Sequence, residues 1–400
     1  MRGLNNHGSN MKKFNLNVLM LLSLGHCMTD IYQGALTAAL PFLKDKLDLS
    51  YTAAGFILIA SNLASSVIQP LFGLVSDRKE KPLLLPLGCL FAGLGFSLLA
   101  FPTQFAVILL LTLMSGLGVA AYHPEGFKTA SYFTGEKKAT GMSVFSVGGN
   151  LGFALGPFCT FFIITHYGLS YLPVMIVPSL LFVGLIFVFW RAIHVPERVK
   201  TTDKHDGSKK KSVKSAYIAL SLVVGAVIMR SWTQFGLITY IPFYYKDHLK
   251  GDPMYAGKLV SVFLLAAVIG TLVGARLADR WGHKRYLAIS FALTSLVLPL
   301  IFLTKGVSLF VIFGVLGLVL ISSFSITVVM AQRLLPDNIG MASGLTVGFS
   351  IGTGGLGVTL LGMIADSYGV PAALEFITIL PVAGLLLALL VKYPEALKTG

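Results

Sequence analysis

Long apolar runs dominate this chain and restrict what it can fold into. Hydrophobic residues make up 55% of its 400 residues and charged residues only 12%, a composition typical of integral membrane proteins. A membrane-spanning helix needs about 20 consecutive apolar residues, whereas the strands of a membrane barrel are alternating segments of about 10 residues. The runs in this chain are continuous and long, so the sequence predicts an all-α integral membrane protein.

Twelve membrane-spanning helices are expected, and the longest polar segment separates them into two sets of six. The first run contains His26 and Asp30 and lacks a small-residue cleavage site, so we expect a retained helix rather than a signal peptide. The expected helices are 14–43, 50–76, 82–101, 105–133, 138–166 and 169–192 in the first set, and 215–245, 254–279, 285–303, 307–334, 338–367 and 371–391 in the second.

The expected domain organisation follows from these helices and from the distribution of charge. Most of the 31 lysines and arginines fall on the side of the membrane that holds both tails and the linker. Cytoplasmic loops carry such an excess, so both termini are predicted to be cytoplasmic. The net charge of +14 is then explained by orientation, and no nucleic-acid partner is expected. The predicted segments are an N-terminal cytoplasmic tail (1–13), a six-helix half (14–192), a basic cytoplasmic linker (193–214), a second six-helix half (215–392) and a C-terminal cytoplasmic tail (393–400).

Two motifs occur once in each half, which indicates an internal repeat. The segment GLVSDRKEKP at 73–82 is echoed by GARLADRWGHKR at 274–285, and each copy ends a helix before a short basic turn. The segment ATGMSVFSVGGNLG at 139–152 is echoed by MASGLTVGFSIGTGG at 341–355. Parallel repeats of this kind place a substrate site near the middle of the membrane, between two halves that rock against each other.

The loops after the second and eighth helices resemble the signature of the major facilitator superfamily. The second copy fits closely, and the first departs from the signature where Lys79-Glu80 stands in place of the glycine. Over nearly the whole chain, the sequence resembles the fosmidomycin-resistance type of efflux transporter within that superfamily. The residues that carry this resemblance are His26, Asp30 to Gly34, Gln69-Pro70, Gly73, Asp77-Arg78, His123-Pro124-Glu125, Gly148 to Gly152, Gly156-Pro157, Arg230-Ser231, Gln332, Leu335-Pro336 and Gly340 to Gly344.

The resemblance implies a twelve-helix bundle of two six-helix halves, related by a parallel pseudo-repeat and working by alternating access. Gly148 to Pro157 also resembles the glycine-rich motif of the proton-coupled antiporters of that superfamily. The implied function is proton-coupled export of a small drug or metabolite, such as a fosmidomycin-like phosphonate or another anion, across a bacterial-type inner membrane. The implied partners are the substrate, protons and the lipid bilayer. The implied energy source is the proton gradient, and no cofactor is expected. The protein is expected to be a monomer.

Two other functions stay open at the level of the sequence. One is a proton-coupled symporter that imports a small nutrient. The other is a non-transporting membrane receptor, which is disfavoured because no loop is long enough to form a soluble module. An enzyme is not expected, since we find no Walker-type phosphate-binding motif and no metal or nucleophile motif.

Four titratable residues inside the predicted helices are candidates for proton coupling: Asp30, His26, Glu125 and His123. A charged carboxylate at the middle of a membrane costs about 2.5–3.5 kcal/mol, so Asp30 needs a partner or a wet cavity. His26, Asp30 and Gln33 share one helical face because they are spaced i, i+4 and i+7. The alternative for Asp30 is a structural hydrogen bond between helices.

Glu125 and His123 have structural interpretations that are equally well supported by the sequence. Glu125 could anchor a basic residue such as Lys128 or Arg78 at the cytoplasmic end of its helix. His123 could be a buried hydrogen-bonding residue. Proline at position 124 removes a backbone donor and is expected to kink the helix.

Arg230 is the basic residue placed deep in a predicted span, where a guanidinium needs an anion or a wet cavity. It could pair with Asp30 across the two halves, or it could hold the phosphonate or carboxylate of an anionic substrate. The polar residues of several helices could line the same pathway or bond to a neighbouring helix. These further substrate-binding candidates are Asp30, Gln33, Tyr32, Tyr122, Asn62, Gln69, Asn150, Gln234 and Gln332.

The repeated motif at the helix ends predicts a cytoplasmic gate. Its aspartates and arginines are expected to form ion pairs that stabilise the outward-open state, although the basic residues alone could serve to anchor topology. These gate residues are Asp77, Arg78, Asp279, Arg280 and Arg285. Small residues at helical spacing, Gly148, Gly152 and Gly156 leading into Pro157, predict a face on which another helix packs closely.

Overall fold

The computed structural model describes residues 14–49, 51–78, 81–193, 207–244 and 253–393. Both tails lie outside the described residues, apart from Tyr393, and so does most of the predicted linker. All regular secondary structure in the described ranges is helical. The predicted all-α class is therefore confirmed.

Six helical rods make up the first half. Three of them contain irregular turns: a π-helical turn, η1, separates α2 from α3, a short 3-10 turn, η2, follows α4, and a 3-10 segment, η3, precedes α7. The bounds are α1 Leu16–Leu47, α2 Tyr51–Asn62, η1 Leu63–Val67, α3 Gln69–Asp77, α4 Leu84–Ser97, η2 Leu98–Ala100, α5 Phe105–Tyr132, α6 Lys138–Tyr167, η3 Leu169–Ile176 and α7 Val177–Val188.

The second half repeats this plan with six more rods. α8 begins at Gly207, so the last residues of the predicted linker are helical rather than part of a loop. The bounds are α8 Gly207–Phe243, α9 Pro253–Trp281, α10 His283–Val297, η5 Leu298–Phe302, α11 Val307–Leu320, η6 Ile321–Ser323, α12 Phe324–Leu334, α13 Ile339–Tyr368 and α14 Val370–Leu390.

Among the described residues, 10 helices are long and apolar enough to cross a membrane. The remaining two rods are α1, which carries Asp30, and Leu84–Ala100, which is shorter. The twelve rods correspond one to one to the twelve predicted spans. The chain is a multi-pass membrane protein.

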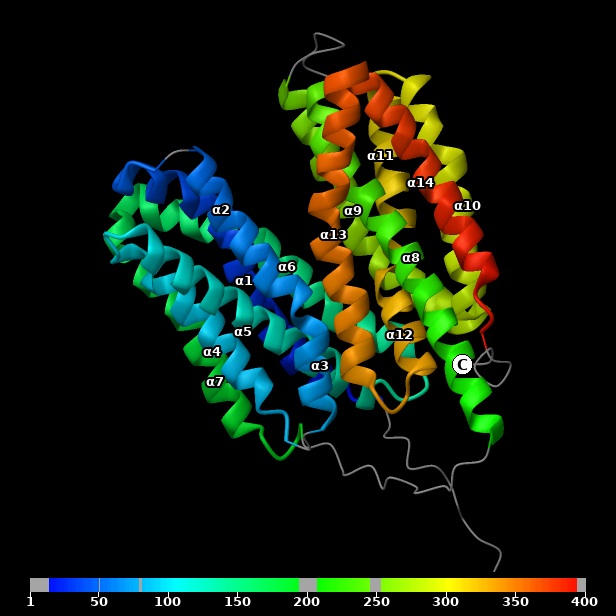
Figure 1. The fold of residues 1–400 in the computed structure, drawn as a ribbon, viewed down its shortest axis with the longest axis horizontal. Helices are drawn as coiled ribbons and strands as arrows, with labels where there is room; N and C mark the ends of the chain where they lie inside the picture. Colours follow the sequence, from blue (N-terminus) through cyan, green and yellow to red (C-terminus); the bar gives the residue numbers. More distant parts are fainter. Residues whose placement is uncertain (1–13, 50, 79–80, 194–206, 245–252, 394–400) are drawn as a thin grey trace, which may run out of the picture.

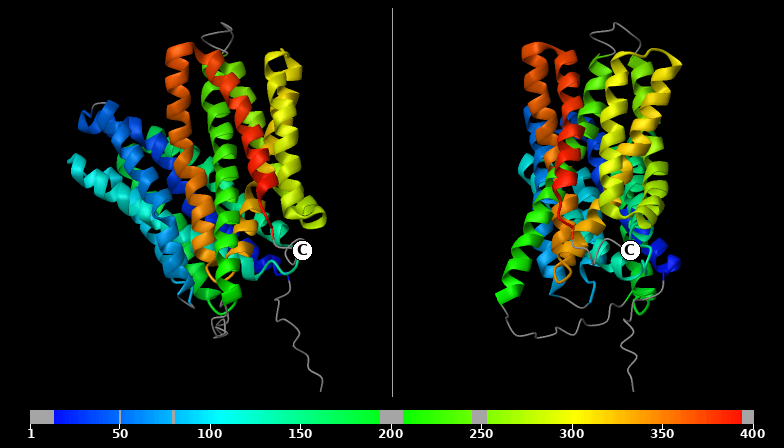
Figure 2. Two further views of the ribbon diagram at one scale, coloured as in Figure 1. Left: turned by 45° about the vertical axis from the view of Figure 1, so that its right-hand side comes forward. Right: turned by 90° about the vertical axis from the view of Figure 1, so that its right-hand side faces the viewer.

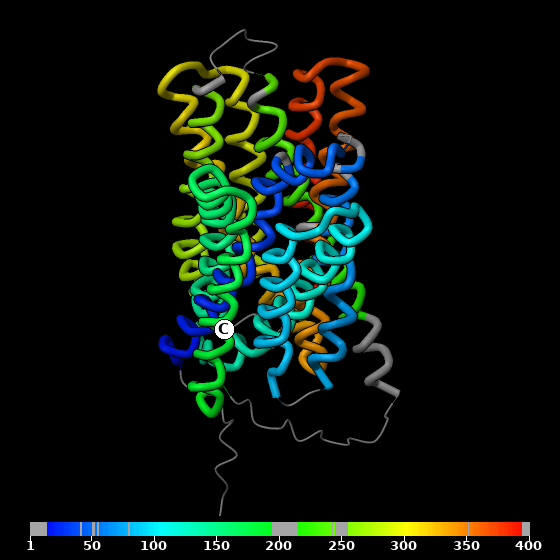
Figure 3. Tube along the Cα trace, turned by 90° about the vertical axis from the view of Figure 1, so that its left-hand side faces the viewer, coloured from blue at the N-terminus to red at the C-terminus, as the bar shows by residue number. Residues whose placement is uncertain are grey.

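The helices α1–α7 gather on one side of the molecule and α8–α14 on the other (Figure 1). The two groups lie close together at the end that carries α12 and the C-terminal end of α3. They diverge towards the opposite end (Figures 1 and 2). Seen from the side of the first group, the rods of both groups run from one end of the molecule to the other (Figure 3). This arrangement brings residues from both groups together at the narrow end.

Glycines let α6 lie directly against α1. A Cβ atom at Gly148, Gly152 or Gly156 would be 2.0–2.2 Å from the carbonyl oxygen of Ser23, Cys27 or Ile31, respectively. No side chain fits in that space, so the predicted small-residue face of α6 is the face that contacts α1. Pro157 lies inside α6 and does not end the helix.

Candidate functional site

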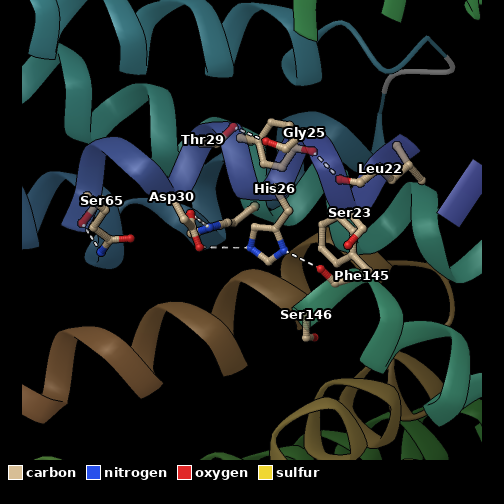
Figure 4. A network of polar contacts seen from close by, with 12 residues as sticks. Leu22, Ser23, Gly25, His26, Thr29, Asp30, Ser65, Phe145 and Ser146 are labelled. Atoms are coloured by element: carbon tan, nitrogen blue, oxygen red, sulfur yellow. Dashed lines mark hydrogen bonds and ion pairs between the residues drawn. The ribbon is translucent and has the colours of Figure 1, made fainter. Parts of the chain in front are cut away.

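Three titratable side chains meet between α1 and α5. His123 Nε2 is 2.8 Å from Asp30 Oδ1, and His26 Nε2 is 3.3 Å from Asp30 Oδ2. All three side chains are buried. Figure 4 shows Asp30 and His26 on the same helix, with the imidazole extending from the carboxylate towards Phe145. We call this group the proton triad.

Hydrogen-bond partners define where the protons of this triad lie. The carbonyl oxygen of Phe145 is 2.9 Å from His26 Nδ1, and because a carbonyl only accepts, Nδ1 must carry a hydrogen. Gln69 Nε2 donates to the carbonyl of Ser65 at 2.6 Å, and its second hydrogen faces His123 Nδ1 at 3.1 Å. His123 therefore accepts at Nδ1 and donates from Nε2 to Asp30.

The proton that this arrangement can gain or lose lies between Asp30 and His26. His26 Nε2 presents a lone pair to Asp30 Oδ2, so a proton between these two atoms makes a hydrogen bond, and its loss leaves two acceptors 3.3 Å apart. The site can thus exist in two states that differ by one charge. That property is required of a group that couples proton movement to a conformational change.

The backbone of α6 closes one wall of the triad at Gly149. A Cβ atom there would lie 2.5 Å from His26 Nε2 and 2.7 Å from Asp30 Oδ2. Gly149 is thus a site residue that sequence reasoning missed, although it belongs to the glycine motif.

Arg230, on α8, is buried and has no anionic partner among the described residues. Its guanidinium donates to Ser350 Oγ at 3.0 Å and to Thr327 Oγ1 at 3.2 Å, and it forms no ion pair with any described residue. The Nε atom has no hydrogen-bond partner within the described structure. Ser231 Oγ lies 2.8 Å from Ser350 Oγ, so hydroxyl groups surround the cation. A buried cation of this kind has unused capacity to bind an anion.

Two phenylalanines lie between the triad and Arg230. The ring of Phe127 is 5.7 Å from that of His26 and 6.4 Å from that of Phe324, and the Arg230 guanidinium lies 5.0 Å from the Phe324 ring centroid. The proposed pairing of Arg230 with Asp30 is therefore wrong for this conformation. Asp30 is satisfied by two histidines, and aromatic rings separate the two charges.

Both tyrosines proposed to bind substrate are instead used between helices of the first half. The hydroxyl of Tyr122 donates to the carbonyl of Leu22 at 3.0 Å. That of Tyr32 donates to the carbonyl of Met175 at 2.9 Å and accepts from Ser179. Both rings are buried. Neither is placed to contact a substrate in this conformation.

The amide candidates fall into three groups. Asn62 and Asn150 are exposed, and Gln33 and Gln234 are half-buried, with Gln33 3.5 Å from Ser65 Oγ. Gln332 is buried and bonds to the carbonyl of Phe127 and to Ser343 Oγ, which joins the two groups of helices. Gln69 belongs to the triad network. In this conformation, the described hydrogen bonds of Gln69 and Gln332 go to protein groups.

Glu125 is placed in an ion pair rather than in the triad. Its Oε1 is 2.9 Å from Lys128 Nζ, and Lys128 Nζ donates to the carbonyl of Ser76 at 2.6 Å. Both charged side chains are buried. This arrangement fits the structural alternative, in which Glu125 anchors Lys128 near the end of α3.

The aspartates of the repeated motif contact helix N-termini in the opposite half. Asp77 accepts from the backbone N–H groups of Gly340 and Met341, at the start of α13, at 2.7 and 3.0 Å. Asp279 accepts from those of Ala139 and Thr140, at the start of α6, at 2.9 and 2.8 Å. Helix N-termini carry unsatisfied N–H groups and a partial positive charge. These two caps join the two groups of helices at the narrow end, and we call them the gate after the predicted role of the motif.

The structure adds partners that the predicted gate did not include. Arg78, Arg280 and Arg285 are exposed, whereas the aspartates accept from backbone N–H groups of the other half, and Asp279 also accepts from the hydroxyl of Thr140 at 2.7 Å. Asp279 also has His283 Nε2 at 3.4 Å. A sequence motif indicates which side chains are present but not which backbone groups they contact. The backbone partners of the aspartates were therefore not predicted.

Replacing Asp279 with asparagine is expected to shift the protein towards opening at the narrow end. The change removes the charge and one of the two cap acceptors, at a cost of about 1 kcal/mol, which lowers the ratio of closed to open protein about fivefold. Distances between spin labels on α3 and α13 measure this shift. Asp366→Asn, at the exposed far end of α13, is the matched control, and equal distances in both variants would refute the gate.

The comparisons with known proteins agree with this fold. The family profile "Major Facilitator Superfamily" matches residues 22–346 and 223–399. An uncharacterised MFS-type transporter of Bacillus subtilis (strain 168), YfnC, is 34% identical over 93% of this chain and 92% of its own length. The fosmidomycin resistance protein of Escherichia coli (strain K12) is 30% identical over 92% of this chain and 91% of its own length.

A solved structure shares the fold at lower identity. The transporter FucP in its outward conformation superposes with a TM-score of 0.74 at 14% identity, over 94% of this chain and 99% of its own. The predicted superfamily is confirmed by these matches. The chain, with its twelve helices, repeated gate and buried polar site, belongs to the major facilitator superfamily of transporters.

Proposed function

We propose that this chain is a proton-coupled antiporter that exports a small anionic drug or metabolite by alternating access. The observation that carries the proposal is the buried guanidinium of Arg230, which has hydroxyl neighbours and no ion pair among the described residues. Leaving a cation unpaired in a low-dielectric interior is costly. In the proposed mechanism, an anionic substrate supplies the missing partner.

The proton triad provides the second half of the exchange. It lies on α1 and α5, in the opposite half from Arg230, and it changes by one charge when a proton leaves. Binding of an anion near Arg230 and protonation of Asp30 act on two halves that move against each other. Because the two sites are separate, the anion and the proton can each bind, in turn, from the same side of the membrane.

The substrate class follows from the chemistry of the Arg230 site and from one relative. A fork of N–H donors with nearby hydroxyls suits the oxygens of a phosphonate or carboxylate. The E. coli relative is a fosmidomycin resistance protein, and fosmidomycin is a phosphonate. We therefore propose a phosphonate of this kind as the first substrate to test.

The proposed setting is a bacterial inner membrane, with both termini cytoplasmic. The excess of lysine and arginine on the side of the termini supports this orientation. The gate then closes the cytoplasmic side, and the conformation described above is open outward. The proton gradient is the proposed energy source, and the proposed functional unit is a monomer.

Proteoliposomes that contain a pH-sensitive dye test the direction of coupling. The membrane voltage is clamped, and fosmidomycin is added outside. An antiporter exchanges entering substrate for leaving protons, so the lumen is expected to become alkaline. A symporter would acidify the lumen, and an unchanged pH would reject proton coupling of this substrate. Protein-free liposomes and an uncharged phosphonate diester are the controls.

A further inference from the structure

Gln69 occupies an unusual position in the helix that follows α2. It is the first residue of α3, directly after the π-helical turn Leu63–Val67 and Ile68, and it precedes Pro70. Its side chain is completely buried. π-helical turns inside α-helices are rare and occur frequently at functional sites. The break therefore marks this residue for attention.

Both hydrogens of the Gln69 amide are used, and its oxygen is not. Nε2 donates to the carbonyl of Ser65 at 2.6 Å and faces His123 Nδ1 at 3.1 Å. Oε1 has no hydrogen-bond partner within the described structure. The amide orientation is fixed by Ser65, because a rotated amide would set two carbonyl oxygens against each other.

A proton on His123 conflicts with this orientation. A doubly protonated imidazole carries a hydrogen on Nδ1, which would then face the N–H of Gln69. Two donors cannot share one hydrogen bond. Rotation of the amide brings Oε1 to His123 and satisfies it, but the carbonyl of Ser65 then loses its donor. The unused oxygen is available for this exchange.

The carbonyl that loses the Gln69 donor lies in the π-helical turn. Pro70 has no N–H, so the carbonyl of Ser66 also lacks its normal α-helical donor at i+4. Two neighbouring carbonyls of the π-turn thus depend on groups other than the regular helical ladder. A change at Ser65 is therefore expected to alter the bend between α2 and α3.

The same backbone is the surface on which α13 packs. A Cβ atom at Gly344 would be 2.7 Å from the carbonyl oxygen of Gln69, and one at Gly348 would be 2.4 Å from that of Ser66. α13 carries Ser350, which bonds to Arg230. A change in the bend thus moves a helix that forms part of the anion site.

We propose that Gln69 is a positioning residue that responds to protonation of His123 by rotating its amide, and that this rotation changes the contact of the π-turn with α13. The inference rests on the proposed proton coupling and adds the route by which a proton affects the opposite half. Gln69 contacts neither the substrate nor the shared proton between Asp30 and His26. Its role is to connect the triad to the moving interface.

The groups around His123 allow the assignment to be specific. Asp30 and His26 face it from α1, and Tyr122 is adjacent on α5, with a ring centroid 6.4 Å away. On α5 itself, Glu125 is paired with Lys128. The charged or titratable residues of α3, α6 and α13 are Asp77, Lys138, Cys159, His166, Tyr167, Asp366 and Tyr368. Gln69 is the side chain that α3 presents to the ring.

Two substitutions separate this role from simple packing. Gln69→Leu keeps a side chain of comparable size but removes the donor and the acceptor. Gln69→Glu offers a carboxylate that accepts from protonated His123 without rotation. Gln104→Leu, at the exposed N-cap of α5, is the control. Spin labels at Phe56→Cys on α2 and Val307→Cys on α11, both exposed positions, report the separation of the two halves as pH is varied.

In the spin-labelled protein, two of the three native cysteines are kept and one is replaced. Cys27 and Cys89 are buried and are protected from the label, and Cys159, which is half-buried, is replaced by alanine. In the otherwise unchanged protein, we expect the label distance to change with pH. Gln69→Leu should remove at least half of this change, and Gln69→Glu should move its midpoint to higher pH by about one unit, the effect of ~1.4 kcal/mol.

Each result of these pH measurements either supports or overturns the proposed role of Gln69. A Gln69→Leu variant with the same pH response as the parent protein overturns the proposal, and so does a midpoint that Gln69→Glu leaves in place. A parent protein without any pH response overturns both the proposal and the proton coupling. If the pH response is present but fosmidomycin moves no protons, the substrate assignment fails while Gln69 keeps its role.

Discussion

Asparagine in place of Asp30 is expected to abolish proton-driven accumulation of substrate and to leave substrate exchange intact. The side chain of asparagine fits the triad in its protonated form. Its oxygen accepts from His123 Nε2 as Oδ1 does at 2.8 Å, and its N–H₂ donates to His26 Nε2, where Oδ2 is 3.3 Å away. The variant therefore keeps both hydrogen bonds but cannot release the proton.

Two transport measurements on proteoliposomes check this result. Accumulation driven by a pH gradient should fall to the equilibrium level. Counterflow, in which labelled substrate exchanges for unlabelled substrate, should stay within about fivefold of the parent rate, the effect of ~1 kcal/mol. Asp366→Asn is the control, because it removes a carboxylate that is exposed. Retained accumulation in Asp30→Asn would exclude Asp30 as the coupling group.

The fold was largely predictable because membrane helices are specified by simple physics. A backbone in hydrocarbon must satisfy its own hydrogen bonds, so an apolar run of sufficient length has few alternatives to a helix. The largest difference at the first helix is its end, which is Leu47 rather than residue 43. The basic residues Lys44 and Lys46 lie in its last turn, where they are favourable to the helix dipole. The sequence pattern had assigned them to a loop.

The site was predictable only in part. The i, i+4 spacing of His26 and Asp30 already placed both on one face, but the pairing with His123 needs the close approach of α1 and α5, which no local pattern specifies. Gln69 was identified as polar and not as a partner of a histidine. Ionisable and amide side chains are rare inside membranes, so these residues could be recognised as candidates from the sequence.

The remaining site residues lack such a signal. Ser350 and Thr327 bond to Arg230, but hydroxyl residues are common in membrane helices, where they bond to their own backbone. Phe127 and Phe324 are ordinary among the 28 phenylalanines of the chain. The gate aspartates accept from backbone N–H groups, which every residue except proline has, and from the hydroxyl of Thr140. Their roles arise from tertiary packing, and only the structure identifies them.

Replacing Arg230 with methionine is expected to eliminate binding of anionic substrate without destabilising the protein. Methionine has a similar length and carries no charge, so it removes a buried cation that has no ion pair within the described structure. Replacing a buried charge by a well-packed apolar side chain is often neutral or stabilising. A substrate that is held by the guanidinium loses two charge-assisted hydrogen bonds, about 3 kcal/mol, so the affinity should fall at least about a hundredfold.

Binding of fosmidomycin to the purified protein, together with thermal unfolding, checks this prediction. The melting temperature of Arg230→Met should equal or exceed that of the parent, so that lost binding is not attributed to unfolding. Arg230→Lys keeps the charge but not the planar fork, and it should bind with intermediate affinity. Arg276→Ala, which removes an exposed arginine of the same half, should change nothing. If Arg230→Met binds the phosphonate as tightly as the parent protein, then the anion lies elsewhere and the buried cation has a structural purpose.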